Sequence, residues 1–134
     1  MDTTASAQSD FLKVVIADDD PAILRLLSVW LGNEGYQVRT AGNGEEALDL
    51  IDADCPHFLI TDWEMPGMNG LELCRRVREL NLPHYVYIMF LTVKSGQDEF
   101  VEGMDVGADE FIIKPVHRFS FLAQLRAGRR VLQL

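Results

Sequence analysis

The chain has 134 residues, of which 48% are hydrophobic and 25% charged, which is the size and composition of one globular domain. It carries 12 Lys and Arg against 21 Asp and Glu, and this net charge of −9 argues against non-specific binding to nucleic acid or to an anionic membrane. Cys55 and Cys74 have neither metal-ligand spacing nor a disulfide framework, which indicates a reducing compartment. Residues 1–10 lack the features of a signal peptide, so we expect a flexible N-terminal tail and a cytoplasmic protein.

The first predicted element is a buried strand over residues 13–17, followed at once by Asp18 and Asp19. A third acid, Asp20, precedes Pro21, and proline is favoured in the first turn of a helix. We therefore expect Asp20 to cap the N-terminus of a helix. Asp18 and Asp19 should lie at the tip of the strand.

The middle of the chain repeats this order of a strand followed by a helix. A second strand is predicted over 37–41, and Asn43 begins a capping-box pattern for a second helix. The apolar run 58–60 predicts a buried strand that delivers Asp62 just beyond its carboxyl end. A Met-Pro-Gly turn follows, and the third helix is expected to begin near Gly70.

The last strands also end in polar residues. An aromatic and β-branched strand over 85–91 delivers Thr92, and a helix is predicted over 97–106. A fifth strand, over 110–113, delivers Lys114. Each of the last two strands therefore places a polar side chain at its carboxyl end.

Five apolar strands that alternate with helices are typical of a parallel sheet covered on both faces. Right-handed crossovers favour the α/β class and a flavodoxin-like, doubly wound (βα)5 fold with strand order 2-1-3-4-5. In that order strands one and three are neighbours, so Asp18, Asp19 and Asp62 should meet at one edge of the sheet. Thr92 and Lys114 come from strand tips on the same edge.

Several carboxylates within a few ångströms either raise one another's pKa values or bind a cation. An all-oxygen site open to solvent suits Mg²⁺. Lys114 can pair with a carboxylate at rest and with an anion when one arrives, and Thr92 adds a hydroxyl group. Together these groups indicate a phosphoryl-transfer site with Asp62 as the nucleophile.

Four short motifs occur in the same order and with the same spacing in a known family. They are Ala17-Asp-Asp-Asp20, Thr61-Asp-Trp-Glu-Met-Pro-Gly-Met-Asn-Gly70, Leu91-Thr92 and Ile113-Lys-Pro115. With them, residues 11–125 resemble the receiver domain of two-component response regulators, in particular the chemotaxis type. The resemblance covers nearly the whole chain.

The resemblance implies that Asp62 accepts a phosphoryl group from a phosphohistidine of a sensor histidine kinase or a histidine phosphotransfer protein. It also implies that Asp18, Asp19 and Asp62, with the backbone carbonyl of Glu64, hold Mg²⁺. The domain would then switch conformation to control an output domain or a partner.

By the same resemblance, Lys114 and Thr92 bind the phosphoryl oxygens. Movement of Thr92 toward the phosphoryl group is coupled to inward rotation of an aromatic ring, here Phe111, where many members have tyrosine. The bond between Lys114 and Pro115 is expected to be cis. Val93 stands where a smaller residue is commoner, which narrows access to the phosphoryl group.

Glu64 and Lys94 each lie two residues beyond a site residue. Our hypothesis is that they pair across the mouth of the site and tune the lifetime of the phosphoryl group. Trp63 is expected to be partly exposed near the site. We assign no partner to the loop histidines, including His57 and His84.

The last helix is expected to begin near Ser120. Residues 126–134 are interpreted as its end and as the start of a linker helix to an absent output domain, for which a diguanylate cyclase is one candidate. In the family, the helix 97–106, the strand 110–113 and the last helix form the usual interaction face. This face is the candidate surface for a homodimer.

Two alternative functions stay open. A degenerate receiver would serve only as a docking module that phosphorylation does not control. An aspartyl-phosphate phosphatase needs an acid/base carboxylate two residues after the nucleophile, and Glu64 nearly satisfies this. We expect instead a switch that is no turnover enzyme and catalyses only its own phosphorylation and dephosphorylation. Direct binding to nucleic acid or to a membrane is not expected.

Overall fold

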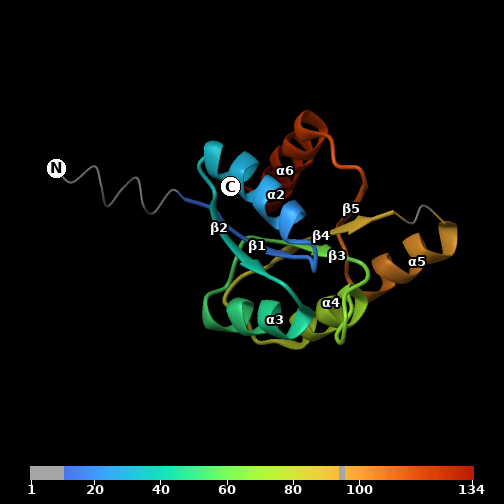
Figure 1. The fold of residues 1–134 in the computed structure, drawn as a ribbon. Coiled ribbons are helices and arrows are strands. Elements are labelled where there is room, and N and C mark those ends of the chain that lie inside the picture. Colours follow the sequence, from blue (N-terminus) through green and yellow to red (C-terminus); the bar gives the residue numbers. More distant parts are fainter. Residues whose placement is uncertain (1–10, 94–95) are drawn as a thin grey trace.

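The structure, a computed structural model, describes residues 11–93 and 96–134. In this part of the chain five strands alternate with five helices (Figure 1). In chain order they are β1 (Lys13–Ala17), α2 (Pro21–Asn33), β2 (Gln37–Ala41), α3 (Gly44–Ala53), β3 (Phe58–Asp62), α4 (Gly70–Glu79), β4 (Tyr87–Thr92), α5 (Gln97–Val106), β5 (Glu110–Ile113) and α6 (Arg118–Leu132). The expected tail, residues 1–10, lies outside the described residues.

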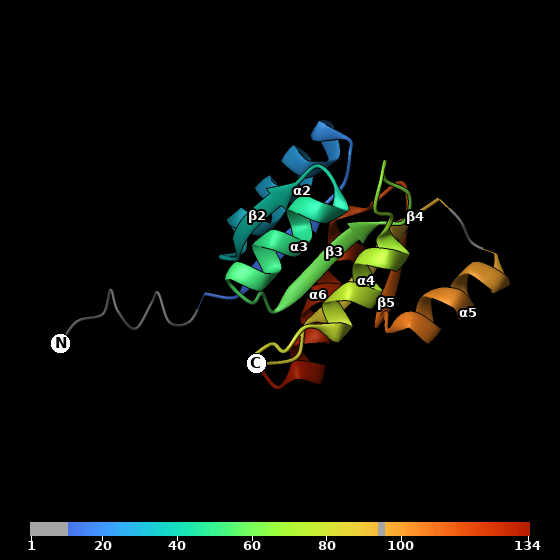
Figure 2. The ribbon, with the colours of Figure 1, turned by 90° about the horizontal axis from the view of Figure 1, so that it is seen from below.

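All neighbouring strands are parallel, and their order is β2-β1-β3-β4-β5. Helices α2 and α6 cover one face of this sheet, and α3, α4 and α5 lie on the other (Figures 1 and 2). The predicted flavodoxin-like fold and its strand order are therefore confirmed.

Two hydrophobic cores follow from the two-residue period of the strands. In β1, Val14 and Ile16 face the core beneath α2 and α6, whereas Val15 and Ala17 face the core beneath α3 and α4. All four are fully buried, because helices cover both faces of the sheet. This explains why the strands are apolar throughout rather than alternating.

Three helices begin at side-chain caps, and two of these caps, Asp20 and Asn43, are predicted above. The side chain of Asp20 accepts a hydrogen bond from the Ala22 amide, and that of Asn43 accepts one from the Glu46 amide. Asn69 begins α4 in the same way. These caps fix where the chain leaves the acidic edge of the sheet after β1 and β3, and so help to position the loops there.

Two element boundaries differ from the sequence prediction. Strand β4 begins at Tyr87 rather than at Tyr85, because the Val86 carbonyl accepts from Arg78 instead of from a neighbouring strand. Helix α6 begins at residue 118, two residues earlier than expected, and ends at residue 132.

The chain turns directly after α6. Gln133 adopts a left-handed conformation with φ of 62°, and the Leu134 amide donates to the carbonyl of Arg129 at 2.9 Å. Residues 126–132 are thus the last turns of α6. None of the helices among the described residues has the length and apolar character needed to cross a bilayer.

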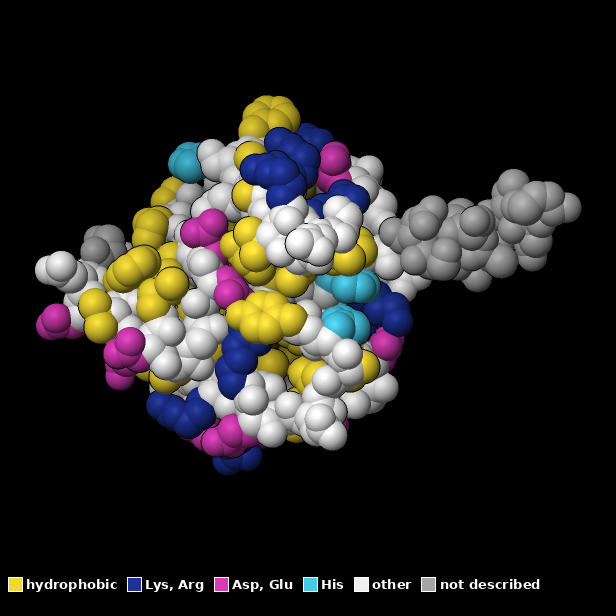
Figure 3. Space-filling model, turned by 180° about the vertical axis from the view of Figure 1, so that it is seen from behind, with side chains coloured by type: hydrophobic (Ala, Val, Ile, Leu, Met, Phe, Trp, Pro, Cys, Tyr) yellow, Lys and Arg dark blue, Asp and Glu magenta, His cyan; other side chains and the backbone are white. Residues whose placement is uncertain are grey.

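Besides Val131 in the last turn of α6, five large hydrophobic side chains are exposed on α5, β5 and α6. They are Phe100, Val101, Met104, Ile113 and Phe119. Figure 3 shows hydrophobic side chains gathered over this side of the molecule. We call these five residues the α5–β5–α6 surface.

Candidate functional site

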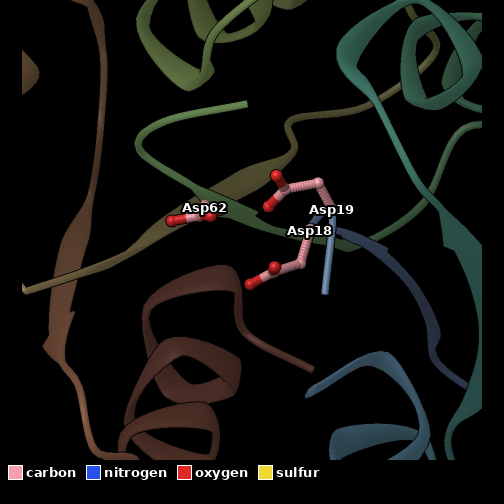
Figure 4. A group of neighbouring side chains, drawn as sticks. All are labelled: Asp18, Asp19 and Asp62. Carbon is pink, nitrogen blue, oxygen red and sulfur yellow. The ribbon is translucent and has the colours of Figure 1, made fainter. Parts of the chain in front are cut away.

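Three carboxylates meet at the carboxyl edge of the sheet. Asp18 and Asp19 follow β1 directly, and Asp62 is the last residue of the neighbouring strand β3 (Figure 4). Each contributes an oxygen atom, and these atoms lie within 4.8 Å of one another. The structure therefore brings together the three acids that the strand order predicts to be neighbours.

Asp18 is the most deeply buried of the three, with no exposed surface. Its Oδ1 accepts from the Asp20 amide at 2.9 Å, and its own amide donates to the Ala41 carbonyl at 3.1 Å. Asp19 is exposed, and Asp62 keeps 13% of its side chain exposed. The group thus ranges from a buried, fixed carboxylate to one that solvent reaches freely.

Lys114 lies between two of these acids. Its Nζ is 3.2 Å from Asp18 and 3.4 Å from Asp62, and its amide donates to the Thr92 carbonyl at 2.8 Å. Burial alone would lower the pKa of Lys114, but the carboxylates of Asp18 and Asp62 outweigh it and raise that pKa. The ammonium group is therefore charged at neutral pH and bridges the two strand tips.

Asp62 lies in an environment that disfavours its charged form. Burial raises the pKa of its carboxyl group, Asp18 raises it further, and Lys114 only partly offsets these effects. Three carboxylates with one lysine leave an excess of negative charge, which a bound cation would neutralise. The donors are all oxygen atoms, as Mg²⁺ prefers, so this cluster fits a magnesium site.

A pocket of about 250 Å³ opens beside Asp62. It is lined by Asp62, Trp63, Glu64, Thr92, Val93 and Lys114. Thr92 is buried at the tip of β4, whereas 74% of Val93 is exposed at the rim. The pocket is small and polar at its base, which suits a compact anion such as a phosphoryl group.

The turn after Asp62 depends on a glycine whose steric role we did not infer from the sequence. The Gly70 amide donates to the Trp63 carbonyl at 2.9 Å, which closes the turn at the start of α4. A Cβ at Gly70 would overlap the carbonyl oxygen of Asp62 and would lie 2.8 Å from the Phe90 ring. The sequence signals a helix start here, but it carries no sign of this close approach.

Trp63 does not have the exposure we expected. Only 6% of it is accessible, because its ring packs 5.0 Å from the Phe90 ring and 6.0 Å from the Phe111 ring, measured between centroids. Phe111 is half-buried and also contacts Phe100. The expectation of a partly exposed tryptophan is therefore wrong.

The remaining expected residues are placed as follows. Glu64 is exposed and lines the pocket beside Asp62, and Lys94 lies outside the described residues. The bond between Lys114 and Pro115 is cis, as the resemblance implies.

Two histidines have partners that we did not predict. His57 accepts a hydrogen bond from the Lys13 amide at 3.0 Å, and its ring stacks on that of His84 at 4.8 Å between centroids. Both residues lie at the amino edge of the sheet, opposite the acidic cluster. The expectation that they lack partners is wrong, because the loops before β3 and β4 meet there.

Comparison with known proteins gives a consistent result. Residues 14–126 match the family described as response regulator receiver domain. The chain is 35% identical over 118 residues to the phosphate regulon transcriptional regulatory protein PhoB of Rhizobium meliloti, covering 88% of this chain and 52% of PhoB. It is 39% identical over 118 residues to the response regulator MprA of Mycobacterium avium, covering 87% of this chain and 50% of MprA. The chain thus spans about half the length of these relatives.

Solved structures agree with the sequence relatives. The chemotaxis protein CheY4 of Vibrio cholerae superposes with a TM-score of 0.84 at 31% identity, over 88% of this chain and 98% of that one. A putative response regulator from Chloroflexus aurantiacus gives a TM-score of 0.82 at 32% identity, over 89% of this chain and 98% of that one.

Proposed function

The chain belongs to the family of response regulator receiver domains, and from this premise we propose that Asp62 is its phosphoacceptor. The observation that carries the proposal is the arrangement at the carboxyl edge of the sheet. A half-buried carboxylate with a raised pKa lies beside two further acids and one lysine, at the base of a small open pocket. A structural aspartate at the end of a strand would not need these neighbours.

In the proposed reaction an oxygen of Asp62 attacks the phosphorus of a phosphohistidine on a sensor kinase or a histidine phosphotransfer protein. The phosphorus–nitrogen bond breaks, and the imidazole leaves. Asp18, Asp19 and Asp62, with the carbonyl of Glu64, would hold Mg²⁺, which supplies positive charge for the transferring phosphoryl oxygens.

Lys114 and Thr92 would bind the phosphoryl oxygens. The Lys114 ammonium group now bridges Asp18 and Asp62 at 3.2 and 3.4 Å, so it needs only a small shift to reach an oxygen bound to Asp62. Thr92 lines the same pocket and brings a hydroxyl group. These residues act once on their own chain, and so the domain is a switch rather than a turnover enzyme.

We further propose that Glu64 and Lys94 tune the lifetime of the acyl phosphate. Glu64 lies at the pocket beside Asp62, where water must approach the phosphorus. Alanine at either position should change the dephosphorylation rate, measured by loss of the phosphorylated mass with time. Unchanged rates in both variants would remove this part of the proposal.

The output side of the switch would be the α5–β5–α6 surface, reached through Thr92 and Phe111. Helix α5 carries four acids and no base, whereas α6 carries four arginines and no acid. In a two-fold symmetric dimer the same patch meets itself, so α5 of each copy can face α6 of the other. The exposed hydrophobic residues would lie between these charges, which favours a homodimer through this surface.

We also propose that residues 126–134 lead into an output domain in a cytoplasmic regulator. One relative is named a transcriptional regulatory protein, which gives one class of output. The diguanylate cyclase expected from the sequence stays a proposal as well. The intact mass of the full-length protein would test for an output domain. Light scattering with and without phosphorylation would test the dimer.

The decisive experiment compares intact masses after addition of acetyl phosphate and Mg²⁺. We expect one phosphoryl adduct in the wild type, and none in Asp62→Asn or when Mg²⁺ is removed. Asp20→Asn is the matched control, since Asp20 caps α2 and asparagine caps equally well. It should still form the adduct.

Other outcomes would favour the alternatives. No adduct in any variant would favour a docking module that phosphorylation does not control. Multiple turnover of a small phosphomonoester would favour an aspartyl-phosphate phosphatase.

A further inference from the structure

Helix α5 contains a glycine where the helix meets two aromatic rings. Gly103 is buried in the middle of α5, and glycine is among the poorest helix formers. A Cβ at this position would overlap the tip of the Phe111 ring and would lie 3.2 Å from the Trp63 ring. The missing side chain therefore makes room for both rings at the surface of the helix.

Another helical glycine serves as a comparison. Gly32, in the last turns of α2, has no atom within 4 Å of the place where its Cβ would lie. Alanine should therefore fit at Gly32 without contact. The close packing at Gly103 is absent at Gly32, because it depends on the aromatic rings of Trp63, just after β3, and Phe111, in β5.

The rings at Gly103 connect directly to the acidic cluster. Trp63 follows Asp62 in the chain, and its amide donates to the Leu91 carbonyl at 3.0 Å. Its ring packs against those of Phe90 and Phe111, which also contact each other with centroids 5.6 Å apart. Trp63 therefore forms a continuous path of contacts from α5 to the neighbouring Asp62.

We infer that Gly103 is a positioning residue that couples α5 to the phosphoacceptor. The absence of a side chain lets Phe111 and Trp63 pack inward against α5, and this packing holds Asp62 in the geometry that accepts a phosphoryl group. A ligand on Asp62 and the position of α5 then depend on each other through these two rings. The inference rests on the proposed phosphoacceptor function.

The test uses a Trp30→Phe background, so that Trp63 is the remaining one of the two tryptophans. Fluoroberyllate with Mg²⁺ serves as the phosphoryl analogue, and Trp63 fluorescence reports its binding. We expect Gly103→Ala to weaken fluoroberyllate binding roughly tenfold and to slow phosphorylation by acetyl phosphate. Gly32→Ala is the matched control and should bind as the parent does.

A double-mutant cycle separates coupling from a general loss of packing. Phe111→Leu shortens the side chain that an alanine at 103 would meet. In the Phe111→Leu background, Gly103→Ala should therefore weaken fluoroberyllate binding less than threefold, in contrast to its roughly tenfold effect with Phe111 present. A loss of equal size in both backgrounds would overturn the inference, as would parental binding by folded Gly103→Ala.

Hydrogen exchange keeps the inference testable if Gly103→Ala does not fold. In the parent, fluoroberyllate should change the exchange of the amides in residues 97–106. In Phe111→Leu that change should shrink several-fold while fluoroberyllate still binds, and an undiminished change would contradict the coupling. If the parent itself does not respond to fluoroberyllate, the proposed phosphoacceptor function fails rather than the role of Gly103.

Discussion

The two edges of the sheet differ in whether their charged side chains have partners that offset the charge. At the carboxyl edge, Asp18, Asp19 and Asp62 share one lysine, Lys114, and burial and like charge raise the pKa of Asp62. At the amino edge, the charged side chain of Arg78 is surrounded by acceptors. At the carboxyl edge the negative charges repel one another until a cation binds, whereas at the amino edge the charged side chain already has its hydrogen-bond acceptors.

Arg78 is the centre of the amino edge. It donates to the carbonyls of Val86 and Gly107 at 2.7 Å each, and to Asp109 at 3.0 Å. Its guanidinium also lies 4.4 Å from the centre of the Tyr85 ring, and the Tyr85 hydroxyl donates to Asp109 at 2.7 Å. These contacts join α4 to the starts of β4 and β5, so this edge should contribute stability rather than chemistry.

The largest expected effect on stability follows from that assignment. Arg78→Ala should lower the free energy of unfolding by about 3 kcal/mol, because the carbonyls of Val86 and Gly107 lose their Arg78 donor and Asp109 loses its ion-pair partner. Phosphorylation by acetyl phosphate should persist in the folded protein. Chemical denaturation and intact mass measure the two quantities.

The matched control lies on the same helix. Arg75 pairs with Glu72 at an exposed position, so Arg75→Ala should cost less than about 0.5 kcal/mol. Equal losses in the two variants would contradict the special role of Arg78. Loss of phosphorylation in folded Arg78→Ala would contradict the separation of the two edges.

At the carboxyl edge, removing a charge should raise the free energy of unfolding instead of lowering it. Asp62→Asn should raise the free energy of unfolding by about 1 kcal/mol at neutral pH without Mg²⁺, because it removes a charge that burial and Asp18 disfavour. Addition of Mg²⁺ at ten times its Kd should stabilise the wild type by about 1.4 kcal/mol. Thermal unfolding with and without Mg²⁺ measures both effects.

Asp52→Asn, on the exposed side of α3, is the control for charge removal alone. It should change stability little and keep the response to Mg²⁺. A destabilised Asp62→Asn would show that the attraction to Lys114 outweighs the repulsion from Asp18.

The two edges also differ in how far the sequence predicts them. Asp18, Asp19 and Asp62 could be placed together because each follows or ends a strand, and the carboxyl ends of parallel strands share one edge. Strand tips likewise place Thr92 and Lys114. These predictions need only the strand order, which hydrophobic patterning and crossover rules supply.

The other contacts depend on helix and loop packing that no local pattern encodes. Arg78 and Asp109 are 31 residues apart, and nothing in either segment predicts their pairing. The burial of Trp63 requires the Phe111 ring and the gap at Gly103, which come from β5 and α5. Such contacts depend on the shapes of several elements at once, so they appear only in three dimensions.

The smallest expected effect concerns His57 at the amino edge. Burial lowers the pKa of His57 below its usual value of 6.5, nearby His84 and Lys13 lower it further, and Asp54 only partly opposes them. The neutral ring accepts from the Lys13 amide, which a protonated ring cannot do. The unfolded chain therefore binds more protons than the folded one, and stability should fall as the pH drops below about 6.5.

His57→Asn should flatten this pH dependence, because an asparagine oxygen can accept from the same amide without titrating. His117→Asn, at the exposed start of α6, is the matched control and should keep the wild-type slope. Denaturation midpoints between about pH 5 and pH 8 measure the slope of stability against pH. An unchanged slope in His57→Asn would assign the titration to another group. It would also show that the amino edge tolerates a charged imidazole, which would weaken the contrast with the carboxyl edge.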